Sequence, residues 1–568
     1  MAIPGQALVQ GVSQLDDMKS AILTRHRELK QHWRPLTLRQ QLWENMYFLL
    51  DAIQQAKPLG VARRFVSNEP HTGVDAALSI LTRIPPTWRI PLVGAEDENQ
   101  EMRRRAGRIE RTLEGLVYTM DELFVDRINH DTLWRAATFQ GLLRGMIWGK
   151  FHITTEALLY RRAPLVAEIY DAYQVFPHTD SWGLNHIIIE KDTTLGDLVS
   201  SYPGVYDDMA QDNHYNPSTP ALKLEFWSND RGERKGMTAV LGTVHTAATS
   251  GITVTDMIGK DARWLVPPFL HGYTYDELPI VGVAVNGAHI SHKAPISSVL
   301  EDRLQERADV QAMEAMAWHG PGSRIAETGR SILSSVEETV PQYNEIVATV
   351  FQHLSLNTYD TLVFKTPTGE LPKFERGIGA SIALNPQESV DTLRPQPMST
   401  DAYRLLELLQ EERQKGVLSN VLQAVAPNVA SGVLLQQIEH AALGSLEPYQ
   451  KGVQSFGTRM GTTLLAQMQK AAPILGAFEL QAGTPSKSFF NIEFNPLTEL
   501  DQGRHYRPVP VIKPALPDDL TVRMTAARMA LDPRRPMLSL MTVMEDILNV
   551  DDPMAESDRI WEDLAQQD

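Results

Sequence analysis

Histidine–carboxylate pairs are the side chains of this sequence with the widest scope for chemistry. His186 and Glu190 lie four residues apart in the run HIIIE, and Glu439 directly precedes His440. Such pairs can ligate a metal or transfer a proton. The first pair lies in a strand-like run with no further ligand in reach, and a lone histidine beside a glutamate on an amphipathic helix is usually a surface residue. We therefore predict no metal site and no catalytic residue at either pair.

Adjacent aspartates are the other candidates, because two-metal nucleases use carboxylates that converge from separate elements. Neighbouring acids in a sequence more often mark solvated turns. Neither a phosphate-binding GxxxxGK[ST] loop nor a GxSxG elbow occurs, and Gly377-Ile378-Gly379 lacks the third glycine of a dinucleotide loop. The sequence predicts that the protein is not an enzyme and takes no cofactor. The aspartate pairs are 16–17, 207–208, 518–519 and 551–552.

The charge of the chain is acidic, with 70 Asp and Glu against 53 Lys and Arg, a net charge of −17. Proteins that hold DNA tightly usually present a basic surface, because their affinity comes from neutralising phosphates. The overall charge disfavours a repressor or nuclease and suits a conduit through which DNA slides. The exception is an arginine cluster with interspersed glutamates, which favours a solvated or intersubunit ion-pair face over a nucleic-acid site. It comprises Arg103, Arg104, Arg105, Arg108 and Arg111 with Glu101, Glu110 and Glu114.

Length and composition predict a soluble protein of several domains. The chain has 568 residues, 43% hydrophobic and 22% charged, and no cysteine. The absence of cysteine excludes disulfides and thiolate chemistry and fits a reducing cytoplasm. We expect no signal peptide and no membrane span, because no basic segment with a following apolar core opens the sequence and no run approaches about 20 apolar residues.

Hydrophobic periodicity predicts an α+β chain. Two helices, with a break near Pro35, are expected over 13–57, and one helix is divided by Pro448. Residues 361–377 predict a β-hairpin around Pro367-Thr368-Gly369. The remaining expected elements are helices at 68–81, 98–149, 295–318, 330–356, 400–414, 432–472, 517–531 and 538–566, strands between 151 and 285 and at 378–384, and an extended run at 487–497.

Several collinear blocks resemble the portal proteins of tailed bacteriophages. ASGVLL at 430–435 is similar to the start of the long wing helix, with Leu434 in place of the usual small residue. The segment 379–414, GASIALNPQESVDTLRPQPMSTDAYRLLELLQEERQ, resembles a tunnel loop and kinked tunnel helix. The other blocks are NEPHTGVDAALSILTRIPP (68–86), LWRAATFQGLLRGMIWGKF (133–151), AYQVFP (172–177), IIEKDTTLGDLVSSYP (188–203), YDELPIVGVAVNG (275–287) and SLMTVMEDILNVDDPMAESDRIWEDL (539–564).

This resemblance implies a mostly helical, multidomain portal fold of wing, stem, clip and crown, which assembles into a usually dodecameric ring around a channel. The clip is expected either in the hairpin at 358–376 or around His319–Gly322. The implied regions are a wing (1–285), stem helices and clip (286–376), a tunnel loop and tunnel helix (377–420), a long wing helix (421–485), and a wing or crown-like region with an acidic end (486–568).

The resemblance also implies partners and a location. A portal ring lies at one capsid vertex of the virion, is assembled in the host cytoplasm, and contacts the terminase large subunit, capsid and scaffolding proteins and head–tail adaptors. Double-stranded DNA passes through it non-specifically. Arg413 and Lys415 are candidates for contacting DNA in the channel, although pairing with Glu411 and Glu412 is the stronger expectation. The alternatives are a cytosolic carboxylate–metal hydrolase or nuclease, and another phage structural protein.

Overall fold

The computed structural model divides the chain into two compact units, each described by itself. Unit 1 comprises Met1–Gln41, Ala76–Ser331 and Leu443–Asp568, and unit 2 comprises Leu42–Asp75 and Ile332–Ala442. Apart from isolated residues, the structure describes residues 12–50, 65–92, 100–126, 131–153, 165–180, 183–194, 220–228, 235–242, 263–271, 279–286, 328–358, 361–365, 389–393, 404–409, 432–483, 489–501 and 503–512.

Two antiparallel sheets form the β-structure at the centre of unit 1. The larger has the strand order β4-β5-β6-β7-β8, and the smaller has the order β3-β2-β9. Because β2 pairs with β9 from more than a hundred residues later, the smaller sheet joins two distant parts of the sequence. The strands are β2 (Met146–Ile153), β3 (Leu165–Tyr170), β4 (Val175–Asp180), β5 (Gly183–Thr194), β6 (Pro220–Ser228), β7 (Lys235–Gly242), β8 (Arg263–His271) and β9 (Ile280–Ala284).

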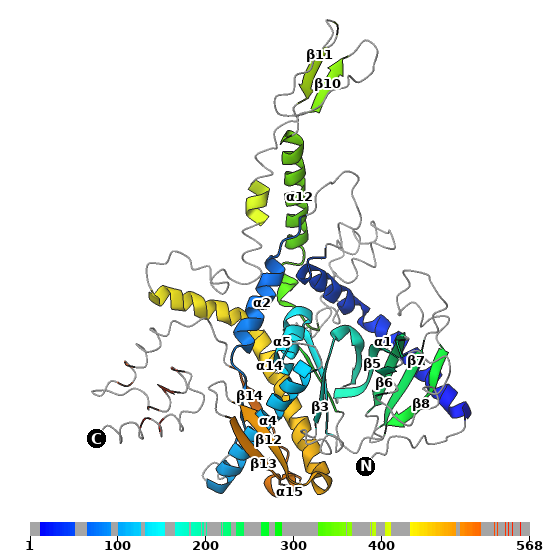
Figure 1. The fold of residues 1–568 in the computed structure, drawn as a ribbon, viewed down its shortest axis with the longest axis vertical. Helices are drawn as coiled ribbons and strands as arrows, with labels where there is room; N and C mark the ends of the chain where they lie inside the picture. The colour runs from blue at the N-terminus through cyan, green and yellow to red at the C-terminus, as the bar shows by residue number, and fades with distance from the viewer. Residues whose placement is uncertain are drawn as a thin grey trace, which may run out of the picture. The chain divides into compact units, whose positions relative to one another are not determined.

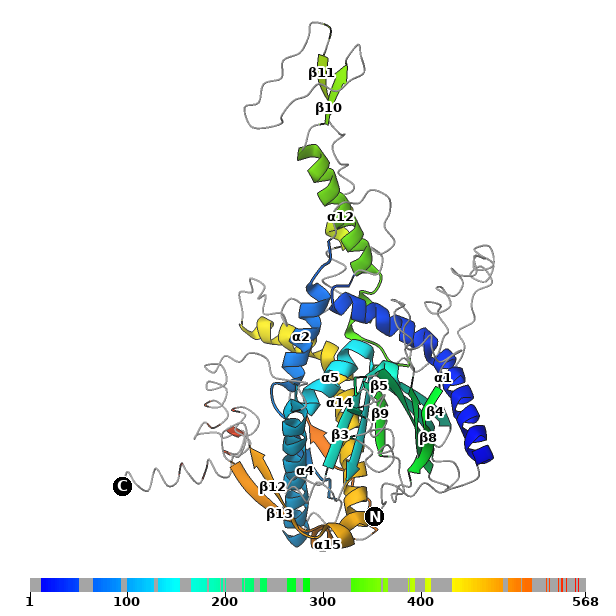
Figure 2. The same ribbon diagram turned by 45° about the vertical axis from the view of Figure 1, so that its right-hand side comes forward.

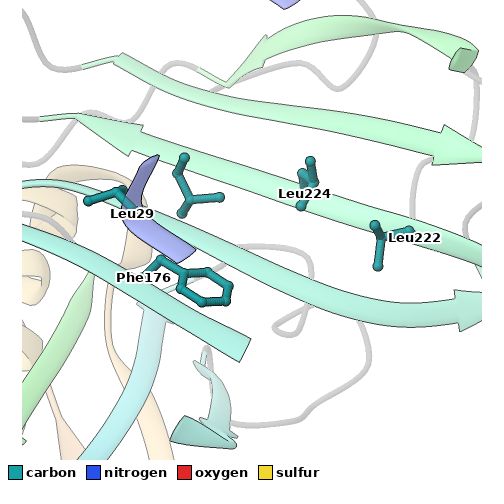
Figure 3. Close-up of a cluster of buried hydrophobic side chains, with 5 residues drawn as sticks. Leu29, Phe176, Leu222 and Leu224 are labelled. Carbon is teal, nitrogen blue, oxygen red and sulfur yellow. The ribbon is translucent and has the colours of Figure 1, made fainter. Parts of the chain in front are cut away.

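Helix α1 (Val12–Tyr47) runs across the larger sheet (Figure 2). Leu29 of α1 packs against Phe176 of β4, and Ile188, Leu222 and Leu224 complete this buried cluster (Figure 3). The Trp33 indole Nε1 donates a hydrogen bond to the Pro177 carbonyl at 2.9 Å. Apolar burial and this directional bond together fix α1 on the sheet.

A second group of elements in unit 1 surrounds the helix α14 (Gly432–Leu475) from Leu443 onward (Figure 1). Helix α5 (Leu133–Arg144) contacts β2, and helix α4 (Gln100–Asp126) contacts β1 and β12. Gly457 and Gly461 of α14 leave room for two indole rings, since a Cβ would lie 2.6 Å from Trp134 and 3.0 Å from Trp88. The other elements here are β1 (Thr87–Arg89), paired with β14 (Val509–Val511), β12 (Phe478–Gly483), paired with β13 (Phe489–Phe494), and α15 (Pro496–Glu499).

Unit 2 is built around helix α12 (Thr339–Thr358). The helix buries one stripe, Val340, Asn344, Val347 and Ala348, at the spacing of a single helical face. The strands β10 (Thr361–Lys365) and β11 (Ser389–Leu393) follow it in sequence and pair antiparallel. Helix α2 (Glu69–Thr82) begins in unit 2, and residues 404–409 are helical.

The α+β prediction is confirmed, and so are the helix at 68–81 and the strand-rich region after residue 151. Both expected proline breaks are wrong, because α1 continues through Pro35 and α14 through Pro448. A proline inside a helix costs about 3 kcal/mol. Buried side chains on either side outweigh that cost: Leu29 and Leu36 lie near Pro35, and Leu446 and Tyr449 flank Pro448.

Two further expectations are corrected. The helix expected to reach residue 149 ends at Arg144, because Gly145 adopts a φ of 69° and the aromatic, β-branched run after it forms β2. The hairpin expected over 361–377 is wrong in its partner, since β10 pairs with β11. The elements expected at 295–318 and 378–384, the second clip candidate at 319–322, and most of 517–531 and 538–566 lie outside the described residues.

We predict that Gly282→Ala destabilises unit 1. A Cβ at Gly282 in β9 would lie 2.0 Å from Cζ3 of the buried Trp148, so the indole or the strand must move. We expect a loss of about 1–3 kcal/mol, measured as a lower denaturation midpoint by near-ultraviolet circular dichroism. The control is Gly107→Ala in α4, where a Cβ meets nothing within 4 Å. An unchanged midpoint for Gly282→Ala would contradict this packing.

Candidate functional site

The residues predicted to contact DNA, Arg413 and Lys415, lie outside the described residues, as do Glu411 and Glu412. Glu439 and His440 belong to α14, but their side chains are not described. The aspartate pairs at 207–208, 518–519 and 551–552 also fall outside, and only the backbone of 16–17 is described, in α1. The described residues therefore do not test the predictions made for these side chains.

His186 and Glu190 are both on β5 but take part in different interactions. The His186 ring stacks on His178 of β4, with centroids 4.5 Å apart and an interplanar angle of 12°. Glu190 pairs instead with α1, at 2.8 Å from His26 Nε2 and 3.0 Å from Lys30 Nζ. Burial raises the pKa of Glu190, but His26 and Lys30 outweigh it and lower the pKa below its ordinary value. Among the described residues, no three His, Asp or Glu side chains lie together as metal ligands.

The arginine cluster of α4 forms ion pairs, but with partners far away in the sequence. Arg105 Nη1 lies 2.6 Å from Asp501 Oδ1, and Arg108 Nη1 lies 2.5 Å from Glu499 Oε1. Two glutamates of α4 accept hydrogen bonds from the backbone at β1. Glu110 Oε1 accepts from the N–H of Ile90, directly after β1, at 2.6 Å. Glu114 accepts from the Trp88 N–H at 3.5 Å. The expected ion-pair face therefore exists, and two of its pairs join α4 to residues far away in the sequence.

A buried charge cluster that the sequence reasoning missed joins the two sheets of unit 1. Glu225 of β6 lies 2.8 Å from Lys150 Nζ of β2 and is also paired with Lys223. The Trp227 indole donates to Glu225 at 3.2 Å, and the Lys150 ammonium lies 5.1 Å from the Trp227 ring centroid. The available signal was the alternation of Lys223 and Glu225, which places two charges on one face of an otherwise apolar strand.

This cluster is organised to hold charge, not to transfer protons. Burial raises the pKa of Glu225, but Lys150 and Lys223 outweigh it and hold the pKa far below its ordinary value. A general base works best with a pKa near the working pH, and this carboxylate is far from that range. Its role is to fix β6 against β2, because a buried carboxylate needs both of its cationic partners.

Exposed apolar side chains of unit 2 form the most distinctive surface feature of the described chain. Among the residues that the structure describes, six of the ten exposed large hydrophobic ones belong to unit 2, although unit 1 is much the larger unit. Leu405 and Leu408 lie three residues apart, on one face of the helical segment 404–409, and are 50% and 53% exposed. We use the name apolar surface for the six exposed apolar residues of unit 2, which come from three segments of the chain: Phe48, Leu49, Leu50, Phe351, Leu405 and Leu408.

Buried and hydrogen-bonded residues of unit 2 hold the segments that carry the apolar surface. Trp43 is fully buried, and its indole donates to Glu337 at 2.9 Å. The Tyr47 hydroxyl donates to Asp75 Oδ1 at 2.9 Å, directly before the exposed residues at 48–50. On α12, the Asn344 amide oxygen accepts from the Ser67 N–H at 3.0 Å. The exposure of the apolar side chains is thus a property of a packed unit.

Comparisons with known proteins leave the family of this chain open. No protein-family model matches the sequence, and no curated protein matches it significantly. Of the helices that the structure describes, none combines the length and the apolar character that crossing a bilayer requires.

We predict that Glu225→Gln destabilises unit 1 by about 3–5 kcal/mol, because it leaves the ammonium groups of Lys150 and Lys223, whose side chains are only 19% and 15% exposed, without this carboxylate. The lowered pKa fixes the sign of the pH dependence. Glu225 adds to the free energy of unfolding relative to glutamine. This contribution is fully present above about pH 4.5, the pKa of the glutamate in the unfolded chain, and is lost as the pH falls through its pKa in the folded chain.

Urea denaturation of both proteins from pH 8 to pH 3 measures this difference. Glu407→Gln, at an exposed position, is the control and should match the wild type. Equal stability of Glu225→Gln and the wild type at neutral pH would contradict the role given to the cluster.

Proposed function

We propose that this chain is the portal protein of a tailed bacteriophage, a subunit of the ring through which DNA enters and leaves the capsid. The proposal begins from the collinear sequence blocks and gains support from the structure of both units. In this role the protein is a structural channel and not an enzyme, and it needs no cofactor. It lies at the portal vertex of the virion after assembly in the host cytoplasm.

The order of elements agrees with the proposed regions. Helix α14 has 44 residues and begins at Gly432, where the resemblance expects the long wing helix. Helix α12, the paired strands β10 and β11, and the helical segment 404–409 follow one another in the order proposed for a stem helix, a clip and the tunnel helix. We propose that the clip extends from Thr361 to Leu393, since β10 and β11 pair across the boundary expected at 376.

The observation that carries the proposal is the apolar surface of unit 2. Exposed leucine and phenylalanine side chains on a packed unit are typical of an interface, because their burial against a partner stabilises the assembly. A ring buries such side chains at every subunit contact, using two different faces of each copy. Assembly into a ring therefore explains why Leu405 and Leu408 face water in a single chain.

The charge of the chain suits a channel. A net charge of −17 per copy gives a ring a strongly negative field, so duplex DNA passes without being held. Arg413 and Lys415 are proposed as transient phosphate contacts in the tunnel region, which begins after Leu393 once the clip is extended and ends at 420. The proposed partners are the terminase large subunit, the major capsid and scaffolding proteins, and head–tail adaptors. The nuclease and the other phage structural protein remain the alternatives that the experiments test.

Mass measurement of the purified chain tests the proposal. Sedimentation velocity and native mass spectrometry should find one closed oligomer with a defined number of copies. Addition of duplex DNA with Mg²⁺ should leave the DNA intact. A protein that stays monomeric at all concentrations, or that cleaves the DNA, would refute the proposal.

We predict that the double variant Leu405→Asp/Leu408→Asp prevents assembly. Each aspartate must be desolvated where a leucine would be buried, and burying a leucine contributes about 1.5–3 kcal/mol. The association constant should fall at least about tenfold per position. The matched control is Leu497→Asp in α15, which replaces a leucine with 51% exposure in unit 1. Equal assembly of the double variant and the control would show that this surface is not the interface.

A further inference from the structure

A stripe of arginines on α4 stands out from the acidic surface of the chain. Arg104, Arg108 and Arg111 follow one another at spacings of four and three residues, so they lie on one face of the helix, and all three are exposed. We name these three residues the arginine stripe. Residues 103–111 contain five arginines and one glutamate, in a chain whose net charge is −17.

Two glutamates of α4 near the arginine stripe, Glu110 and Glu114, accept hydrogen bonds from the backbone at β1. Glu110 lies between Arg108 and Arg111 in the sequence. Its carboxylate accepts a hydrogen bond at 2.6 Å from the N–H of Ile90, the residue directly after β1. Glu114 is also directed at β1, through the Trp88 N–H at 3.5 Å, although it stays close enough to Arg111 to feel its charge. These two glutamates, which the sequence pattern predicts to pair with arginines along the helix, therefore accept hydrogen bonds from the backbone at β1.

The middle arginine is positioned in advance for a ligand. Arg108 Nη1 is held 2.5 Å from Glu499 Oε1, yet 66% of its side chain remains exposed. A guanidinium carries five N–H donors, so several remain available for a second carboxylate. The ion pair with Glu499 already restricts the Arg108 side chain, and α4 itself packs on β1 and β12. Binding a second carboxylate therefore costs little further side-chain entropy.

The chain itself carries the chemical complement of the stripe. Residues Glu545–Asp568 contain nine acidic residues and one arginine, a net charge of −8. Copies that each carry −17 repel one another, and a ring contact joins two different faces of the subunit. A basic stripe on one copy and an acidic segment on the next would offset this repulsion.

We infer that the arginine stripe docks the acidic segment Glu545–Asp568 of a second copy of this chain. The inference rests on the proposed ring and adds one specific contact between its subunits. Carboxylates of the segment accept hydrogen bonds from the guanidinium groups of Arg104, Arg108 and Arg111. The contact is electrostatic, so it weakens as salt rises.

Disulfide trapping tests the contact, because the natural chain contains no cysteine. One full-length preparation carries Gly107→Cys, beside the stripe, where a Cβ meets nothing within 4 Å. The other carries Ile560→Cys, a position 37% exposed within the acidic segment. Each chain has a single cysteine, so any disulfide between the two preparations joins two copies. Mixing, assembly and mild oxidation should give disulfide-linked dimers that contain one chain of each kind.

Three control variants and a high-salt control make the result specific. Gly444→Cys on α14, also in open space, replaces Gly107→Cys to give the background yield. Arg104→Glu/Arg111→Glu should lower the cross-linked yield at least about tenfold, and so should about 1 M salt, where the Debye length is roughly 3 Å. Arg25→Glu/Arg27→Glu, which reverses two exposed arginines of α1, should leave the yield unchanged.

The outcomes separate this inference from the proposed function. Rings of normal mass with cross-linking no higher than the Gly444→Cys background would overturn the inference and leave the ring standing. A chain with both cysteines that cross-links within one copy would also overturn it, because the segment would then occupy its own stripe. Failure of the wild-type chain to assemble would instead remove the proposed function itself.

Discussion

Burial of apolar side chains is the constraint on which this account depends. Each Å² of apolar surface left in water forfeits about 25 cal/mol, and the two units meet that condition differently. Unit 1 encloses Phe151, Phe456 and Trp88 almost completely. Unit 2 fixes its base through Trp43 and leaves Leu408 and its neighbours of the apolar surface exposed. In the proposed ring, another copy would supply the second protein surface that covers these side chains.

Charge imposes a second constraint, and the chain meets it in two ways. Inside unit 1, Glu225 is enclosed with Lys150 and Lys223, so a carboxylate that would otherwise oppose folding holds two sheets together. On the surface, the excess of acid that suits a DNA channel makes copies repel one another. The arginine stripe of α4 is a local exception to this charge, and in the inferred contact it would offset the repulsion between copies.

The sequence predicted the class of structure and many elements, since hydrophobic periodicity is a local property. It failed at Pro35 and Pro448, where packing from distant residues carries a helix through a proline. It also failed at the partner of β10, because strand pairing is decided over long distances. The sequence did not predict the Glu225 cluster for the same reason, because its partner Lys150 lies 75 residues away in the sequence. Of the predicted channel contacts, Arg413 and Lys415 stay predictions outside the described residues.

Electron microscopy of the purified full-length chain tests the central claim most directly. The account predicts top views of closed rings with one rotational symmetry and a central opening wide enough for duplex DNA, about 20 Å. Particles that stay small and compact, or open chains of copies that never close, would contradict it.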